Sequence, residues 1–319
     1  MVATSGGPRS GRPALETGST MFANLILATG LTMAISAHDA KVAYRTVVYA
    51  APAGDPLKAS LFLPPEGKPE LRPAILLIHG SGWLVGTRRL VHWYARRFAE
   101  NGYVTLAINY RKMPRYPYPH CVHDAKAGVR WLRLNARDLR IDPDRIGAFG
   151  NSAGGNLAGL LAATNPKDGM EGASNFGPSS AVRAAVILYG AVDLTLYAKP
   201  EKETALSRAS RRYIARVVGA RDENDLAAFE AASPVTYADE ETAPVLLIHG
   251  KKDHVVRVAQ SQHLYDRLTK LGVPTRLVLV EPGRHGFDYV RRRQRAKVFR
   301  EALAWFDRYL RDAGADGSP

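Results

Sequence analysis

Residues 145–158 read RIGAFGNSAGGNLA, and this sequence predicts a buried strand, a sharp turn and a helix in direct succession. Ser152 stands at the turn, in the pattern G-x-S-x-G. Gly150, Ala153 and Gly154 lack bulk, so the chain can turn tightly enough to expose the serine hydroxyl. The helix that follows presents free amide donors and a partial positive charge at its N-terminus. In this setting the motif predicts that Ser152 is a nucleophile.

The rest of the chain alternates short apolar runs with longer amphipathic stretches. Several apolar runs are nearly continuous in Val, Ile and Leu, as in parallel strands that are covered on both faces. The eight expected strands are residues 43–50, 57–63, 74–79, 103–110, 145–150, 184–189, 244–249 and 275–281, the first two forming a leading antiparallel hairpin. Helices are expected at about 88–101, 120–137, 153–164, 258–271 and 296–311. This alternation predicts an α/β fold whose mainly parallel, eight-stranded sheet has helices on both faces.

The partners that a nucleophilic serine needs follow two later strands. A serine hydroxyl reacts poorly unless a positioned base takes its proton, and histidine is the usual base because its pKa lies near neutral pH. His285 lies in residues 283–287, GRHGF, after the last expected strand. Asp253, at the end of HGKKD in residues 249–253, can orient the imidazole and stabilise its charged form. We therefore expect Ser152, Asp253 and His285 to form a catalytic triad.

Four other ionisable residues near these strand ends are expected to have different roles. Glu281 and Asp288 are rival acids, but both flank His285 too closely to come from a different strand. His79 and His249 each precede a glycine immediately past a strand, so we expect them to form structural hydrogen bonds.

An oxyanion-binding loop is expected in residues 79–83, HGSGW, directly after a strand. Its small residues let backbone amides approach a substrate closely. The donors expected to bind the oxyanion are the backbone N–H groups of Ser81, Gly82 and Ala153.

Together, the HGSGW, GNSAGGNLA, GKKD and GRHGF segments resemble carboxylesterases of the α/β-hydrolase superfamily. The resemblance is to hormone-sensitive-lipase-like esterases and to bacterial acetyl- or feruloyl-esterase-type hydrolases, and it runs from about residue 42 to 311. It implies the α/β-hydrolase fold and acyl transfer without a cofactor. Two residues depart from the usual motifs: Ser81 is the middle residue of what is usually HGGG, and Asn151 stands where the lipase-like group usually has an acidic residue.

The domain organisation expected from the sequence is a flexible N-terminus at 1–40, one domain at 41–312 and a flexible tail at 313–319. Residues 191–240 exceed an ordinary crossover. They are expected to form a small cap that shapes the binding pocket, the alternative being an elaborated crossover.

The apolar, uncharged stretch from Met21 to Ala37 resembles the hydrophobic region of a signal peptide. A cleaved signal would place the protein in the periplasm or outside the cell. The alternative is a buried helix of a cytoplasmic protein. A stable membrane span is not expected, because the stretch is at the short limit for crossing a bilayer and contains Thr, Ser and Gly.

The net charge of +14 predicts a basic surface rather than nucleic-acid binding, because the arginines are spread along the chain and no recognition element accompanies them. The single cysteine, Cys121, excludes an intramolecular disulfide. His120, Cys121 and His123 match no usual zinc spacing, so no metal site is expected. The oligomeric state is left open.

The function predicted from these residues is hydrolysis of carboxylic esters, with a small-molecule or carbohydrate-linked ester as substrate. One alternative is an amide-cleaving hydrolase, arylformamidase-like or prolyl-oligopeptidase-like. The other, less expected, is a non-catalytic interaction protein on the same fold, since such proteins usually lose the nucleophile or the base.

Overall fold

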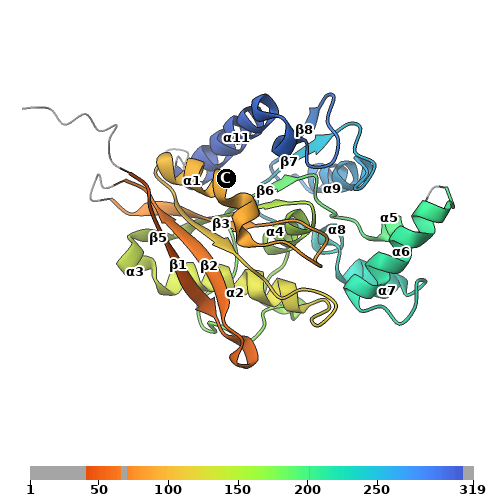
Figure 1. Ribbon diagram of the computed structural model, residues 1–319, viewed down its shortest axis with the longest axis horizontal. Helices are drawn as coiled ribbons and strands as arrows, with labels where there is room; N and C mark the ends of the chain where they lie inside the picture. The colour runs from red at the N-terminus through yellow and green to blue at the C-terminus, as the bar shows by residue number, and fades with distance from the viewer. Residues whose placement is uncertain (1–40, 66–69, 201, 312–319) are drawn as a thin grey trace, which may run out of the picture. The chain divides into compact units, whose positions relative to one another are not determined.

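The computed structural model describes residues 41–65, 70–200 and 202–311, and an eight-stranded sheet runs through them (Figure 1). The strands are β1 (Ala43–Ala50), β2 (Leu57–Leu63), β3 (Arg72–Ile78), β4 (Val104–Ile108), β5 (Ile141–Asn151), β6 (Ala184–Leu188), β7 (Val245–Gly250) and β8 (Thr275–Val280). Their order in the sheet is β1-β2-β4-β3-β5-β6-β7-β8. β2 pairs antiparallel with β1 and β4, and every other pair is parallel. The expected strands, leading hairpin and mainly parallel sheet are confirmed.

The five long helices expected from the sequence are present, with shifted ends. They are α1 (His92–Glu100), α2 (His120–Leu134), α4 (Ala153–Ala163), α9 (Ala259–Lys270) and α11 (Arg292–Phe306). The remaining helices are α3 (Ala136–Leu139), α5 (Thr195–Ala198), α6 (Ala205–Val218), α7 (Leu226–Ala231), α8 (Pro234–Tyr237) and α10 (Phe287–Val290). The expected flexible ends and the signal-like stretch lie outside the described residues.

β5 begins at Ile141, four residues earlier than expected. Its first residues carry no apolar signal in the sequence, because Asp142, Pro143 and Asp144 are polar or ring-constrained and lie mostly outside the core. Ile141 nevertheless pairs with Arg72 of β3, and the register shifts before the regular ladder begins at Ala74.

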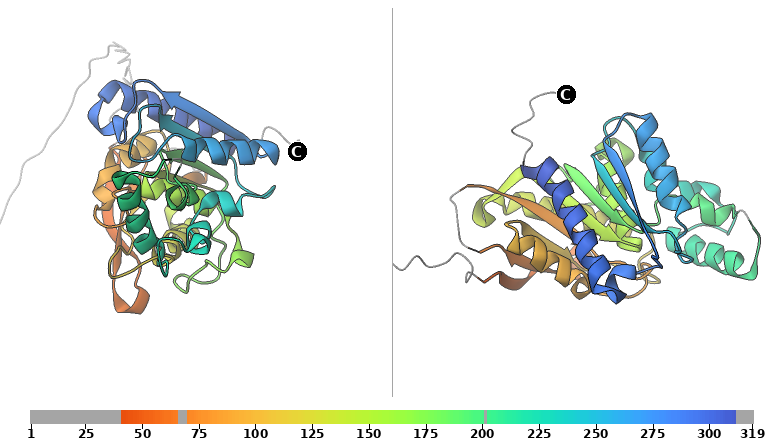
Figure 2. Two further views of the ribbon diagram at one scale, coloured as in Figure 1. Left: turned by 90° about the vertical axis from the view of Figure 1, so that its right-hand side faces the viewer. Right: turned by 90° about the horizontal axis from the view of Figure 1, so that it is seen from above.

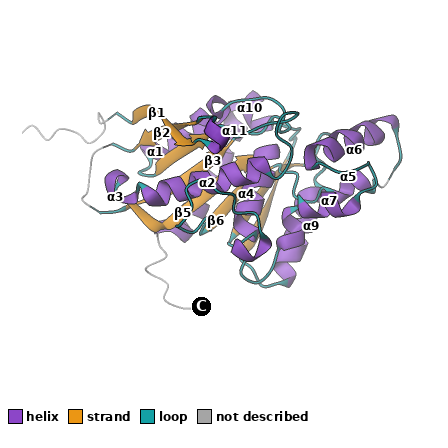
Figure 3. Ribbon diagram, turned by 90° about the horizontal axis from the view of Figure 1, so that it is seen from below, coloured by secondary structure: helices purple, strands orange, loops and turns teal. Residues whose placement is uncertain are grey.

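A hydrophobic core lies on each face of the sheet. Successive side chains of a strand point to opposite faces, so Ile75 and Leu77 of β3 join one core while Leu76 and Ile78 join the other. α1 and α11 cover the first face, where the rings of Phe98 and Phe299 lie 5.0 Å apart (Figure 2). α2, α4 and α9 contribute to the second core, and Figure 3 shows α2 and α4 over that face.

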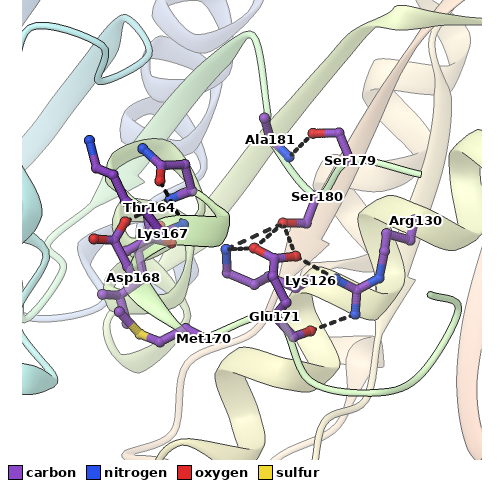
Figure 4. Close-up of polar contacts among 12 residues, drawn as sticks. Lys126, Arg130, Thr164, Lys167, Asp168, Met170, Glu171, Ser179, Ser180 and Ala181 are labelled. Carbon is purple, nitrogen blue, oxygen red and sulfur yellow. Dashed lines mark hydrogen bonds and ion pairs between the residues drawn. The ribbon is translucent and has the colours of Figure 1, made fainter. Parts of the chain in front are cut away.

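A buried ion cluster joins α2 to the loop that precedes β6 (Figure 4). Lys126 Nζ and Arg130 Nη1 lie 2.7 and 2.6 Å from the two carboxylate oxygens of Glu171. Ser180 Oγ donates to the same carboxylate, at 2.7 Å from Oε2. The side chains of Lys126 and Arg130 are 0% and 2% exposed, so two buried cations depend on one carboxylate.

Replacing Glu171 with Gln should destabilise the protein by about 3 kcal/mol or more, because it leaves two buried cations without a counter-charge. Urea unfolding followed by circular dichroism measures the effect. The matched control is Glu241→Gln, which removes a carboxylate 3.6 Å from Lys167 where both side chains are exposed. The control should change the free energy of unfolding by less than about 1 kcal/mol. Equal losses of unfolding free energy in the two variants would contradict the conclusion that Glu171 neutralises two buried cations.

Candidate active site

Ser152 occupies a strained turn between β5 and α4. Its φ and ψ are 52° and −122°, which a residue with a side chain rarely adopts. The turn lies against its neighbours so closely that a Cβ on Gly150 would lie 2.0 Å from the carbonyl oxygen of Gly154. A Cβ on Gly154 would lie 2.2 Å from the carbonyl oxygen of Ile78 in β3. Glycine is therefore required at both positions by backbone contact.

The three residues expected to act together lie within hydrogen-bonding distance of one another. Ser152 Oγ is 2.9 Å from Nε2 of His285, and His285 Nδ1 is 2.7 Å from Oδ2 of Asp253. The other carboxylate oxygen of Asp253 accepts the backbone N–H groups of Val255 and Val256, each at 2.9 Å. Asp253 follows β7 and His285 follows β8, so the carboxyl ends of three parallel strands supply the cluster.

His249 forms the structural hydrogen bonds expected of it and also lies beside Asp253, which the sequence did not indicate. Its Nδ1 is 2.7 Å from Ser261 Oγ, and its Nε2 is 2.8 Å from the carbonyl oxygen of Val256. Nε2 is also 3.5 Å from Oδ2 of Asp253. Burial raises the pKa of the Asp253 carboxyl, but hydrogen bonds from His249 and His285 outweigh that effect and hold the pKa well below its ordinary value. Asp253 is therefore a carboxylate throughout the neutral range.

The two rival acids lie in other environments. Glu281 is exposed and pairs with Lys251, whose Nζ is 2.8 Å from its carboxylate. Asp288 is fully buried, and its carboxylate accepts hydrogen bonds from the phenols of Tyr94 and Tyr189.

The loop after β3 holds three successive residues in left-handed conformations, with φ of 84° at Ser81, 63° at Gly82 and 60° at Trp83. Within residues 41–65, 70–200 and 202–311, the backbone N–H groups of Ser81, Gly82 and Ala153 have no hydrogen-bond acceptor. These three donors are therefore available to a bound molecule.

His79 stabilises this loop from inside the protein, as expected for a structural residue. Its Nδ1 is 2.7 Å from the carbonyl oxygen of Gly80. Burial lowers the pKa of His79 to about 4, so the imidazole is neutral at physiological pH. A second anchor comes from α6, where the phenol of Tyr213 donates to the carbonyl oxygen of Gly82.

Two hollows meet at Ser152. One, a cavity of about 120 Å³, extends toward α6 and is lined by apolar and aromatic side chains that include Ala191, Tyr197 and Ile214. The other is more open, has a volume of about 420 Å³, and is lined by Ser81, His285 and neighbouring residues. Segment 191–240 thus supplies one wall of the site, and Figure 1 shows α5, α6 and α7 lying together beyond the sheet.

The described residues contain neither a metal-binding cluster nor a membrane span. No group of three or more His, Cys, Asp or Glu side chains among them is placed to hold a metal ion. None of the helices in the described ranges has the length and apolar character needed to span a bilayer.

A mainly parallel eight-stranded sheet with a serine after β5, an aspartate after β7 and a histidine after β8 defines the α/β-hydrolase fold. The chain belongs to the BD-FAE family, whose model matches residues 60–268. The match includes Ser152 and Asp253 and ends before His285.

Known relatives agree with this assignment. Esterase LipQ of Mycobacterium tuberculosis is 31% identical over 239 residues, which cover 73% of this chain and 54% of LipQ. A truncated carbohydrate esterase from gut microbiota has a TM-score of 0.74 at 24% identity, covering 85% of this chain and 98% of that one. Butyrate-bound esterase Est2 of Thermogutta terrifontis has a TM-score of 0.69 at 25% identity, covering 86% and 96%. The chain spans about half the length of the curated relatives it matches first.

A fluorophosphonate probe should form a single covalent adduct, at Ser152, because its hydroxyl borders a hollow and lies against a histidine held by a carboxylate. Ser261, the serine beside His249, is fully buried and should not react. Asp253→Asn should slow labelling roughly 10³-fold or more through loss of control over the imidazole tautomer. Glu281→Gln, the matched control at an exposed acid, should label at the wild-type rate. Intact-protein and peptide mass spectrometry measure both, and a slow Glu281→Gln beside a fast Asp253→Asn would contradict the geometry.

Proposed function

We propose that the protein is a carboxylic ester hydrolase that works by acyl transfer through Ser152. The observation that carries the proposal is the hydrogen-bonded series Ser152–His285–Asp253, with distances of 2.9 and 2.7 Å. His285 is the general base, and Asp253 orients it and stabilises its charged form.

In the first half of the reaction, His285 takes the proton of Ser152 Oγ as that oxygen attacks the ester carbonyl carbon. The negative charge that forms on the carbonyl oxygen is bound by the backbone N–H groups of Ser81, Gly82 and Ala153. His285 then donates the proton to the leaving alcohol. Water repeats the sequence on the acyl-enzyme and releases the acid and Ser152.

The acyl group is proposed to occupy the hollow beside α6, with segment 191–240 acting as a small cap. The size and apolar walls of this hollow favour short acyl chains. The butyrate bound to esterase Est2 supports the same proposal, because it is a short acyl group in a similar fold. The alcohol portion, from a small-molecule or carbohydrate-linked ester, is proposed to lie in the more open hollow.

The alternatives have less support. Three curated relatives at 30–31% identity are named as esterases or carboxylic ester hydrolases, which does not favour amide cleavage. A non-catalytic role would leave unexplained the close approach of Ser152, His285 and Asp253 beside unpaired amide donors.

Ser152→Ala and His285→Ala should each lower kcat for p-nitrophenyl butyrate roughly 10³-fold or more while the protein stays folded. The double variant should be little worse than either single one, because the two residues act as a unit. Turnover near the wild-type rate in purified, folded Ser152→Ala protein would refute the proposed function.

Ile214→Ala should widen the hollow beside α6 and shift acyl preference toward longer chains. We expect the kcat/KM ratio of hexanoate to acetate p-nitrophenyl esters to rise about tenfold. Leu206→Ala is the matched control, since Leu206 lies on the same helix but is 70% exposed. An equal change in both variants would contradict the placement of the acyl group.

A further inference from the structure

Asn151, the residue directly before Ser152, has a fully paired carboxamide. The side chain is buried, and its Oδ1 accepts the backbone N–H of Gly80 at 3.2 Å. Its Nδ2 donates to the phenol oxygens of Tyr289 and Tyr189, at 3.0 and 3.3 Å. The strand that carries the serine is thereby joined to the loop that carries Ser81.

The hydrogen bonds continue from Tyr189 to a buried carboxylate. The phenol of Tyr189 donates to Oδ1 of Asp288 at 2.6 Å, and Tyr94 donates to Oδ2 at 2.9 Å. Burial raises the pKa of both phenols well above the ordinary value, and the charge of Asp288 adds to this, so both keep their protons. Along the path Gly80–Asn151–Tyr189–Asp288, each residue therefore donates a hydrogen bond to the next one.

This series also contacts the base. The ring of Tyr189 packs edge-on against the imidazole of His285, with centroids 4.9 Å apart and planes at 67°. Asp288 lies three residues after His285, in the short helix α10 that follows it. The orientation of the Tyr189 ring is fixed at its hydroxyl by Asp288 and Asn151.

We infer that Asn151 and Asp288 are positioning residues. Through Tyr189 they fix the position of the loop that carries Ser81 relative to the loop that carries His285. The inference rests on the proposed function, since the relative position of these loops matters for acyl transfer. Asn151 borders the more open hollow, but the polar atoms of its carboxamide are paired within the protein, and neither residue is proposed to bind the substrate.

Donor counting shows why the amide and the acid must occur together. An aspartate at position 151 would accept from Gly80 but would compete with Asp288 for the single proton of Tyr189, and would add a second buried charge. An asparagine at position 288 alone offers one acceptor oxygen where the phenols of Tyr94 and Tyr189 each need one. Whichever phenol faces its N–H₂ group loses the acceptor for its proton, and Tyr189 cannot give its proton to position 151 instead, because Asn151 donates to its oxygen.

Exchanging the two residues restores a complete set of partners. In the double variant Asn151→Asp/Asp288→Asn, the carboxylate at position 151 would accept from Gly80, Tyr189 and Tyr289. The carboxamide at position 288 would accept from Tyr94 and donate to the oxygen of Tyr189. The series keeps one carboxylate, and the two hydrogen bonds that join position 151 to position 288 through Tyr189 reverse their direction.

The test measures kcat and KM for p-nitrophenyl butyrate, and the inhibition constant of a trifluoromethyl ketone that forms an oxyanion on Ser152, in the wild type, both single variants and the double variant. Each single variant should lower kcat at least about tenfold with KM changed less than about threefold. The double variant should recover most of that loss, and ketone affinity should follow kcat. Additive losses in the double variant would overturn the inference.

Two conservative variants separate positioning from stability. Tyr189→Phe removes the hydroxyl that links Asn151 to Asp288 and should lower kcat. Adding Asn151→Asp or Asp288→Asn to this variant should not restore kcat. Tyr103→Phe is the matched control, because this buried phenol donates to Asp307 at 2.7 Å away from the site, and it should lower stability but not kcat. A Tyr189→Phe enzyme with wild-type kcat, or a double variant that does not fold, would overturn the inference.

Failure of the proposed function gives a different result. If the wild-type protein hydrolyses no ester, that proposal falls, and the rate of fluorophosphonate labelling at Ser152 reports on the same set of variants. Loss in both single variants with recovery in the double variant would still support the inference, and equal rates in all four proteins would refute it.

Discussion

The site depends on one close backbone contact, between the turn at Ser152 and the end of β3. The turn can lie this near Ile78 only because Gly154 has no side chain. The strained conformation of Ser152, with φ of 52°, costs on the order of 1–3 kcal/mol. A hydrogen bond to the neighbouring strand on the opposite side from β3 stabilises this conformation: the N–H of Ser152 donates to the carbonyl oxygen of Leu188 in β6 at 2.9 Å. Exposure of the hydroxyl is thus a consequence of the position of β5 between β3 and β6.

The same arrangement explains why Asp253 and His285 come from distant parts of the sequence and yet lie beside Ser152. Parallel strands end at one edge of the sheet, so the loops after β7 and β8 reach the serine without long insertions. Asp253 is held there by two backbone N–H groups, and His285 by Asp253. Ser152, in its strained turn, therefore lies against an imidazole whose orientation is set by Asp253, which backbone N–H groups hold in place.

The sequence predicted the strands and the serine turn because their signals are local. Continuous apolar runs mark the buried strands, and the glycines around Ser152 mark the turn. The side-chain hydrogen bonds around the site carry no such local signal. Gly80 lies 71 residues from Asn151, and Tyr189 lies 99 residues from Asp288. Such pairs become neighbours only when the sheet is assembled, so neither partner's role can be read from its own surroundings in the chain.

The two departures from the usual motifs differ in kind. Ser81 takes a φ of 84° that glycine adopts more easily, so the loop keeps its shape at some cost in strain. Asn151 instead changes where a charge lies. On the proposed mechanism, negative charge develops on an oxygen held by the amides that follow Gly80, and a carboxylate at position 151 would lie directly behind that loop. With an amide at 151 and the acid at 288, the buried negative charge is separated from Gly80 by a carboxamide and a phenol. Because charge repulsion falls with distance and is strong in a poorly hydrated interior, this placement anchors the loop without opposing the oxyanion that the loop is proposed to bind.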